Sequence, residues 1–137
     1  MLTGPAETCP MLRSAFAAAL IFTAFPAAAQ TLRTLPDAMH GIWGSSSDSC
    51  TNPADDGRVE VRARAVTFFA SQCSLTRFSR SEDGTVTGHG RCRGEGETTT
   101  ERGSLRLRLA GRDRLVIALD GGEDATYQRC ASGLPVR

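Results

Sequence analysis

The residue types that most often do chemistry are sparse in this chain of 137 residues. Its two histidines are His40 and His89, and neither lies in a recognisable nucleophile or metal motif. His89 lies between two glycines, but the strand–loop–helix context of a phosphate-binding loop is missing, which favours a solvent-facing strand residue. These patterns predict no enzyme, no metal site and no cofactor.

Acidic and basic residues gather at a few positions where they could act together. Glu95 and Glu97 would lie on one face of a strand, as an acid–base pair requires, but carboxylates in a glycine-rich segment are typical of a solvated surface. The run 120–124 lacks the oxygen spacing of a calcium loop, and its glycines indicate a hairpin turn. Arg91 and Arg93 likewise indicate a solvated face.

The charge balance excludes some classes of partner. Sixteen basic residues, all of them arginine, stand against fifteen acidic residues, so the formal net charge is +1. A chain with so little net charge generates no strong overall field toward nucleic acid or an anionic membrane. We therefore expect no nucleic-acid partner.

The N-terminal region has the pattern of an export signal. Arg13 precedes a short apolar run that ends in small residues. The run is about a dozen residues long, too short to span a bilayer, and Ala27 with Ala29 predicts cleavage directly after Ala29. Residues 1–29 are predicted to be a signal peptide, with translation starting at either of the first two methionines, and no stable membrane insertion is expected after cleavage.

The cysteines indicate an oxidising compartment. Removing the signal leaves 108 residues (137 − 29) and four cysteines: Cys50, Cys73, Cys92 and Cys130. An even number in a small exported chain predicts two disulfides, and the wide gaps between the four do not fit a thiolate metal site. We expect a periplasmic or secreted protein of a Gram-negative bacterium.

Turn signals recur about every ten residues after the signal, as in an all-β sandwich or barrel. The segment 58–64 alternates apolar and charged residues, and the apolar set then continues with shifted parity, which indicates a bulge or tight turn near Arg64. Glu82-Asp83-Gly84 indicates a hairpin turn. If Arg80 and Thr85 flank that turn, Cys73 faces Cys92 across the hairpin, and the other two cysteines would join the ends of the domain.

The clearest hairpin has its loop at 111–113. Its apolar residues then face one another on one side of the sheet: Leu105, Leu107 and Leu109 against Leu115, Ile117 and Leu119. Counting all such segments predicts a small antiparallel up-and-down barrel or sandwich of seven to eight strands, with two disulfides. Whether the barrel closes is left open.

The mature chain is predicted to have three parts. Residues 30–38 form an extended N-terminal tail, residues 39–130 form the β-barrel domain, and residues 131–137 form a C-terminal tail. The start of the tail has no hydrophobic period, and Pro36 favours extended backbone at the residue before it. The tail is therefore expected to be free of the sheet.

The run from Thr31 to Pro36, followed by Gly41-x-Trp43 and then a cysteine, resembles the start of the small bacterial inhibitors of secreted alkaline zinc proteases. The resemblance extends to about Cys73. It implies a periplasmic eight-stranded barrel of calycin type, with an N-terminal tail that threads into the protease cleft. Trp43 matches the early barrel tryptophan, and we expect it to anchor the core.

Carried over to this sequence, the resemblance implies an inhibitory tail made of Gln30, Thr31, Leu32, Arg33 and Leu35. The two leucines would fill side-chain pockets of the protease, and the arginine would contact an acidic rim. The family's single disulfide implies Cys50–Cys73 here, which leaves Cys92–Cys130 as the second. On the strength of the resemblance we favour this pairing, and the pairing that the hairpin register suggests is its rival.

The sequence thus predicts an exported, non-enzymatic binding protein, monomeric, whose partner is a secreted zinc metalloprotease. Two alternatives remain open. One is a small structural or interaction protein of the cell envelope with another partner, and the second is a barrel that binds a small ligand in its interior.

Overall fold

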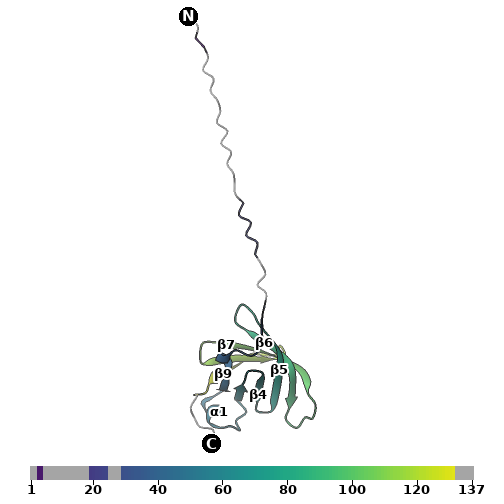
Figure 1. The fold of residues 1–137 in the computed structure, drawn as a ribbon. Helices are drawn as coiled ribbons and strands as arrows, with labels where there is room; N and C mark the ends of the chain where they lie inside the picture. The colour runs from purple at the N-terminus through teal and green to yellow at the C-terminus, as the bar shows by residue number, and fades with distance from the viewer. Residues whose placement is uncertain (1–2, 5–18, 25–28, 132–137) are drawn as a thin grey trace.

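The computed structural model describes residues 3–4, 19–24 and 29–131, so most of the predicted signal peptide and the C-terminal tail lie outside the described residues. Nine strands and one short α-helix make up the fold (Figure 1). They are β1 (Gln30–Leu32), β2 (Gly41–Gly44), α1 (Ser47–Thr51), β3 (Arg58–Val61), β4 (Ala65–Phe68), β5 (Ser71–Arg80), β6 (Val86–Gly94), β7 (Glu101–Leu109), β8 (Arg114–Leu119) and β9 (Ala125–Arg129). A 3₁₀ turn, η1, covers Asp37–Met39.

Strands β2 to β9 form a closed antiparallel barrel in which each strand pairs with the next one along the chain. The pairing of β9 with β2 closes the ring. The prediction of an all-β, up-and-down barrel is confirmed, and the barrel closes. No helix in the described part of the chain is long and apolar enough to cross a membrane.

The β7–β8 hairpin has the register that the sequence predicts. Leu105 pairs with Leu119, and Leu107 pairs with Ile117. Three of these four side chains are buried, whereas Leu119, at the end of β8, is 44% exposed. In β7, where Leu105 and Leu107 are buried and Arg106 between them is exposed, alternation fixes which face enters the core. In β8 the intervening Val116 and Ala118 are buried as well, so burial there does not alternate.

Apolar side chains fill the interior of the barrel. Fourteen buried residues form one cluster, and at one end of it Trp43 has no exposed surface. The indole Nε1 of Trp43 donates a hydrogen bond to the Met39 carbonyl at 3.0 Å, and the guanidinium carbon of Arg129 lies 4.2 Å from the ring centroid. Trp43 thus packs in the core with its one polar atom satisfied.

The disulfides are Cys50–Cys130 and Cys73–Cys92, so the pairing implied by the family resemblance is wrong. The sheet decides this outcome. Cys73 lies opposite Cys92 in the β5–β6 ladder, with their Cα atoms 4.0 Å apart. Cross-strand neighbours are within reach of a disulfide, which leaves the other two cysteines for each other.

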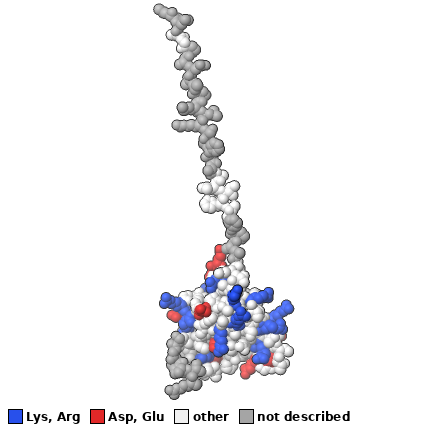
Figure 2. Space-filling view, in the orientation of Figure 1, with Lys and Arg blue, Asp and Glu red and all other residues white. Residues whose placement is uncertain are grey.

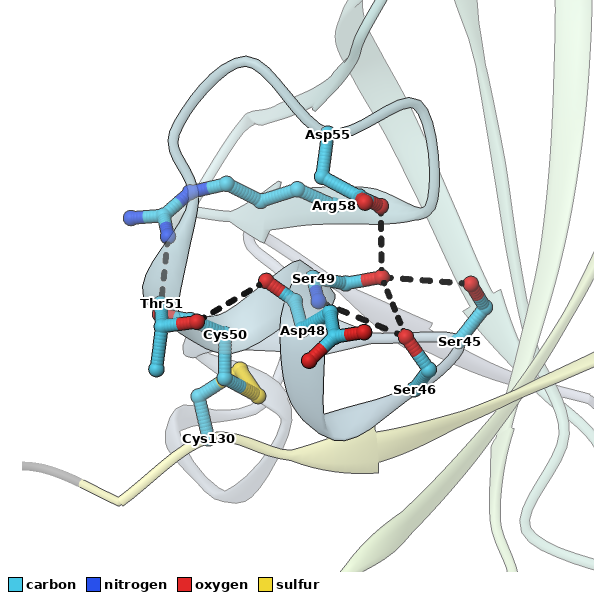
Figure 3. The surroundings of a disulfide bond; sticks show 9 residues. All are labelled: Ser45, Ser46, Asp48, Ser49, Cys50, Thr51, Asp55, Arg58 and Cys130. Atoms are coloured by element: carbon cyan, nitrogen blue, oxygen red, sulfur yellow. Dashed lines mark hydrogen bonds between the residues drawn. A yellow bond between two sulfur atoms is a disulfide. The ribbon is translucent and has the colours of Figure 1, made fainter.

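The Cys50–Cys130 disulfide ties α1 to the end of β9 (Figure 3). Ser49, the residue before Cys50, is fully buried, and its hydroxyl donates to Asp55 at 2.6 Å. The same carboxylate oxygen accepts the Gly57 backbone N–H at 2.8 Å. These two hydrogen bonds lower the pKa of Asp55. The five-residue helix is too short for a sequence period to reveal it, and these side-chain contacts hold it in place.

The β5–β6 turn contains a carboxylate that should make stability depend on pH. The Ser81 hydroxyl and the Thr85 N–H donate to Asp83 and lower its pKa to about 2. Because the folded pKa lies below the unfolded one, Asp83 stabilises the fold above about pH 4, and this contribution disappears as pH falls toward 2. We expect Asp83→Asn to lower Tm at pH 6 and to match the wild type at pH 2.

Thermal unfolding followed by circular dichroism from pH 2 to pH 7 measures this effect. Asp56→Asn is the matched control, because the exposed Asp56 carboxylate makes no side-chain hydrogen bond within the described residues. A constant Tm difference between Asp83→Asn and the wild type over the whole pH range would contradict the prediction.

Candidate functional site

The N-terminal segment is extended, as expected, but it is part of the fold. Strand β1 pairs antiparallel with the end of β5, with Gln30 opposite Arg80 and Leu32 opposite Phe78. Strand β4 covers only the first four residues of the ten-residue β5. The end of β5 would otherwise present unpaired backbone groups, and β1 satisfies them. The prediction of a free tail is wrong for this reason.

The five residues predicted for the inhibitory tail are divided between surface and core. Gln30, Thr31 and Arg33 are exposed, Leu32 packs partly buried against the core, and Leu35 has no exposed surface. The Leu35 N–H also donates to the Ala63 carbonyl at 2.8 Å. Entry of this segment into a protease cleft would require β1 to leave β5 and Leu35 to leave the core. Protease inhibition stays a prediction that these contacts do not support.

The two histidines have separate surroundings. The ring of His40 lies next to the N-terminal segment, with Nε2 2.8 Å from the Leu35 carbonyl oxygen, which is a structural contact. His89 is exposed on the outer face of β6. Within the described residues, no group of three histidine, cysteine or acidic side chains could hold a metal ion.

A β-bulge in β5 creates the most distinctive surface of the barrel. The register of β5 against β6 shifts between Leu75 and Arg77. Leu75 and Phe78 are both buried, and the two residues between them are both exposed. One extra residue in the strand reverses the alternation beyond it. The bulge therefore turns Arg77 to the outer wall, where strict alternation from Cys73 would have sent it into the core.

An open groove of about 680 Å³ lies beside this bulge on the outer wall of β5, β6 and β7. We call it the arginine groove; its lining residues are Thr76, Arg77, His89, Gly90, Arg91, Arg102, Gly103, Ser104 and Asp120. Arg77 lies directly opposite His89, and Arg91 lies directly opposite Arg102. Figure 2 shows that arginine side chains cover more of the visible face of the barrel than acidic ones.

The like charges of Arg91 and Arg102 oppose each other without compensation. Like charges directly across a ladder are destabilising, and within the described residues no acidic side chain forms an ion pair with either of them or with Arg77. Arg91 is held in place by Thr100, which accepts from Nε through its hydroxyl at 2.8 Å and from Nη2 through its carbonyl at 3.3 Å. A guanidinium has five N–H donors, so this anchor leaves three for a ligand.

Asp120 is the one acidic residue among the described residues that line the groove. It has a positive φ of 46°, which asparagine and aspartate tolerate better than most residues. Its carboxylate accepts the Ser104 N–H at 2.6 Å and lies 3.4 Å from the Ser104 hydroxyl. The lining groups carry three positive charges and one negative charge, which gives the groove a net charge of +2 with His89 neutral.

Serine, histidine and aspartate meet in this groove, but their order does not fit nucleophilic catalysis. His89 lies opposite Ser104 in the ladder, yet Asp120 bonds to Ser104 and not to the imidazole. In a catalytic triad the carboxylate orients the histidine, which in turn takes the serine proton. The arrangement instead suits binding of an anion by guanidinium groups.

Part of the groove can be predicted from the sequence. The pattern around Arg91 and Arg93 indicates a solvated face, and both residues are exposed. The repeated arginines at alternate positions in β6 and β7 were a usable signal, because alternate residues share one face of the sheet. Arg77 could not be found in this way, since the bulge changes its face.

Comparisons with protein-family models, curated proteins and solved structures found no match for this chain. The resemblance to protease inhibitors therefore stands on the residues between Thr31 and Cys73 alone. The observed Cys73–Cys92 disulfide is not the one that the resemblance implies.

Proposed function

We propose that this chain is an exported, non-enzymatic binding protein, periplasmic or secreted, that recognises an anionic ligand on the outer wall of its barrel. The observation that carries the proposal is that Arg77, Arg91 and Arg102 line one groove and, among the residues that the structure describes, form no ion pair with an acidic side chain. The planar guanidinium group matches carboxylate and phosphate oxygens with two parallel hydrogen bonds. An anion at this place would also relieve the repulsion between the opposed arginines.

The architecture supports binding on the outside. The interior is occupied by the side chains of the core cluster, which argues against the alternative of a ligand inside the barrel. The groove lies on three paired strands, one of which is tied to its neighbour by the Cys73–Cys92 disulfide. The backbone of such a wall needs no ordering when a ligand binds, so the entropic cost falls on the arginine side chains alone.

Export is supported by the two disulfides, since disulfides persist in oxidising compartments. An envelope or extracellular location would expose the groove to anionic molecules outside the cytoplasm. The total charge of +1 does not oppose this function, because recognition depends on local charge over distances of about 10 Å.

The test is binding of inorganic polyphosphate, measured by isothermal titration calorimetry at 50 mM salt. We expect a triple variant, Arg77→Ala with Arg91→Ala and Arg102→Ala, to bind at least about 100-fold more weakly, because each charge-assisted hydrogen bond contributes about 1.5 kcal/mol or more. Binding by the wild type should weaken as salt is added.

The matched control changes the total charge equally but leaves the groove intact. Arg33, Arg64 and Arg114 are exposed and do not line the groove, so replacing these three by alanine should keep most of the affinity. If both triple variants lose affinity equally, the affinity for polyphosphate depends only on the total charge of the protein, and the proposal is wrong.

A further inference from the structure

The composition of the arginine groove identifies the class of anion more closely. We infer that the groove binds a phosphate monoester carried on a sugar or another polyhydroxylated ring. This inference rests on the proposed function, and it adds the charge, size and polarity of the ligand.

The charge of the groove matches a dianion. Arg77, Arg91 and Arg102 contribute three positive charges, and Asp120 removes one, which leaves +2 with His89 neutral. A phosphate monoester carries about −1.5 to −2 at pH 7, because its second pKa is about 6. A single carboxylate carries −1 and would leave one of the opposed arginines uncompensated.

The arrangement of the charges also fits a group with several acceptor oxygens. Arg77 comes from β5, Arg91 from β6 and Arg102 from β7, so donors approach from three adjacent strands. A phosphate monoester offers three terminal oxygens in a tetrahedral arrangement. A planar carboxylate has two, and one guanidinium fork is enough to bind both.

The size and polarity of the groove call for more than a phosphate. Its volume of about 680 Å³ is in the range of sites for small organic molecules. Among the described residues, its lining consists of glycine, hydroxyl, imidazole and charged groups, and no aliphatic residue, phenylalanine, tyrosine or tryptophan contributes to it. Thr76 and Ser104 supply hydroxyls, and the Asp120 carboxylate is an acceptor for ligand hydroxyl groups. Such a lining suits a ring that carries hydroxyls.

The experiment compares four soluble probes on the full mature chain by titration calorimetry: glucose 6-phosphate, inorganic phosphate, glucuronate and glucose. We expect glucose 6-phosphate to bind at least tenfold more tightly than glucuronate, and more tightly than inorganic phosphate, whereas glucose should not bind. A variant with Arg91→Lys and Arg102→Lys keeps the charges but loses the forked donors. Because the forks hold phosphate and carboxylate oxygens alike, this variant should bind both glucose 6-phosphate and glucuronate more weakly than the wild type, while the preference that depends on charge remains and polyphosphate still binds.

Asp120→Asn separates the contribution of the ring from that of the phosphate. It keeps an acceptor for the Ser104 N–H but removes a negative charge from the groove. We expect it to bind inorganic phosphate more tightly and to lose the advantage of glucose 6-phosphate over inorganic phosphate. An unchanged advantage would contradict a contact between Asp120 and the ring hydroxyls, and with it the assignment of a polyhydroxylated ring.

A phosphorylated ring can be a free metabolite or a lipid headgroup, and vesicles distinguish the two. A flotation assay measures binding to phosphatidylcholine vesicles that contain 5% phosphatidylinositol 4-phosphate and to vesicles of phosphatidylcholine alone. Binding to the first kind only shows that the groove accepts a headgroup, and binding to soluble glucose 6-phosphate without vesicle binding assigns a free ligand.

The same experiments distinguish a failure of this inference from a failure of the proposed anion-binding function. If polyphosphate binds through the groove but glucose 6-phosphate and glucuronate bind equally, the inference of a sugar phosphate is overturned and the proposed anion-binding function stands. If polyphosphate does not bind either, both are wrong.

Discussion

Replacing Cys50 and Cys130 by serine should lower the free energy of unfolding by about 4.5 kcal/mol, because their disulfide closes a loop of 80 residues. Opening so long a loop gives the unfolded chain many more conformations. A domain of this size has a total stability of about 5–15 kcal/mol, so the variant should lose between about a third and nine tenths of it. Urea denaturation followed by circular dichroism measures the change.

The second disulfide is the matched control for this prediction. Cys73 and Cys92 are 19 residues apart, so the same relation gives about 3.2 kcal/mol for the loss of their disulfide. Alanine replaces these two cysteines, because Cys73 has no exposed surface and a serine hydroxyl there would be buried. The expected order of stability is wild type, then the variant without Cys73–Cys92, then the variant without Cys50–Cys130. The reverse order would show that loop closure does not dominate these disulfides.

Replacing Leu35 by alanine should lower the free energy of unfolding by about 3–4 kcal/mol. Its side chain has no exposed surface and belongs to the core cluster, so truncation loses apolar contacts and leaves a cavity. A free inhibitory tail would predict no change in stability. The experiment therefore decides whether the N-terminal segment belongs to the fold, and urea denaturation gives the answer.

Arg33→Ala provides the comparison within the same segment. Arg33 is exposed, and surface substitutions usually change stability by less than about 0.5 kcal/mol. If Leu35→Ala is as stable as Arg33→Ala, the segment does not pack as the structure shows it.

Both predictions concern regions where the structure differs from a prediction made from the sequence. The pairing of the cysteines shows the physical reason. The hairpin pattern placed Cys73 opposite Cys92 on the assumption that Arg80 faces Thr85. In the structure Arg80 faces Val86, one residue further along, and the bulge between Leu75 and Arg77 restores the register that pairs the cysteines. The pairing that the resemblance implied is wrong because Cys50 lies in α1, bonded to Cys130 just after β9, and Cys92, not Cys50, lies opposite Cys73 in the sheet.

The sequence by itself determined the properties that depend on neighbouring residues. Alternation of apolar side chains set the register of the β7–β8 hairpin and the buried face of β7, because the strand period of two leaves only one face for the core. Glycines and aspartates marked the turns, and Gly84 and Gly111 both adopt the positive φ that such turns require. Those signals were enough to predict a small antiparallel barrel or sandwich, and the four cysteines that follow the predicted signal peptide were enough to predict two disulfides.

Only the tertiary structure decided how distant segments meet. Strand β1 docks because β4 leaves the end of β5 unpaired, and nothing near Gln30 in the sequence carries that information. The extra residue of the bulge moves Arg77 to the outer wall, where Arg91 and Arg102 from two other strands border the same groove. Alternation along a strand predicts which face of the sheet a residue occupies only as far as the next β-bulge. Where a bulge occurs depends on packing and backbone pairing across the whole barrel.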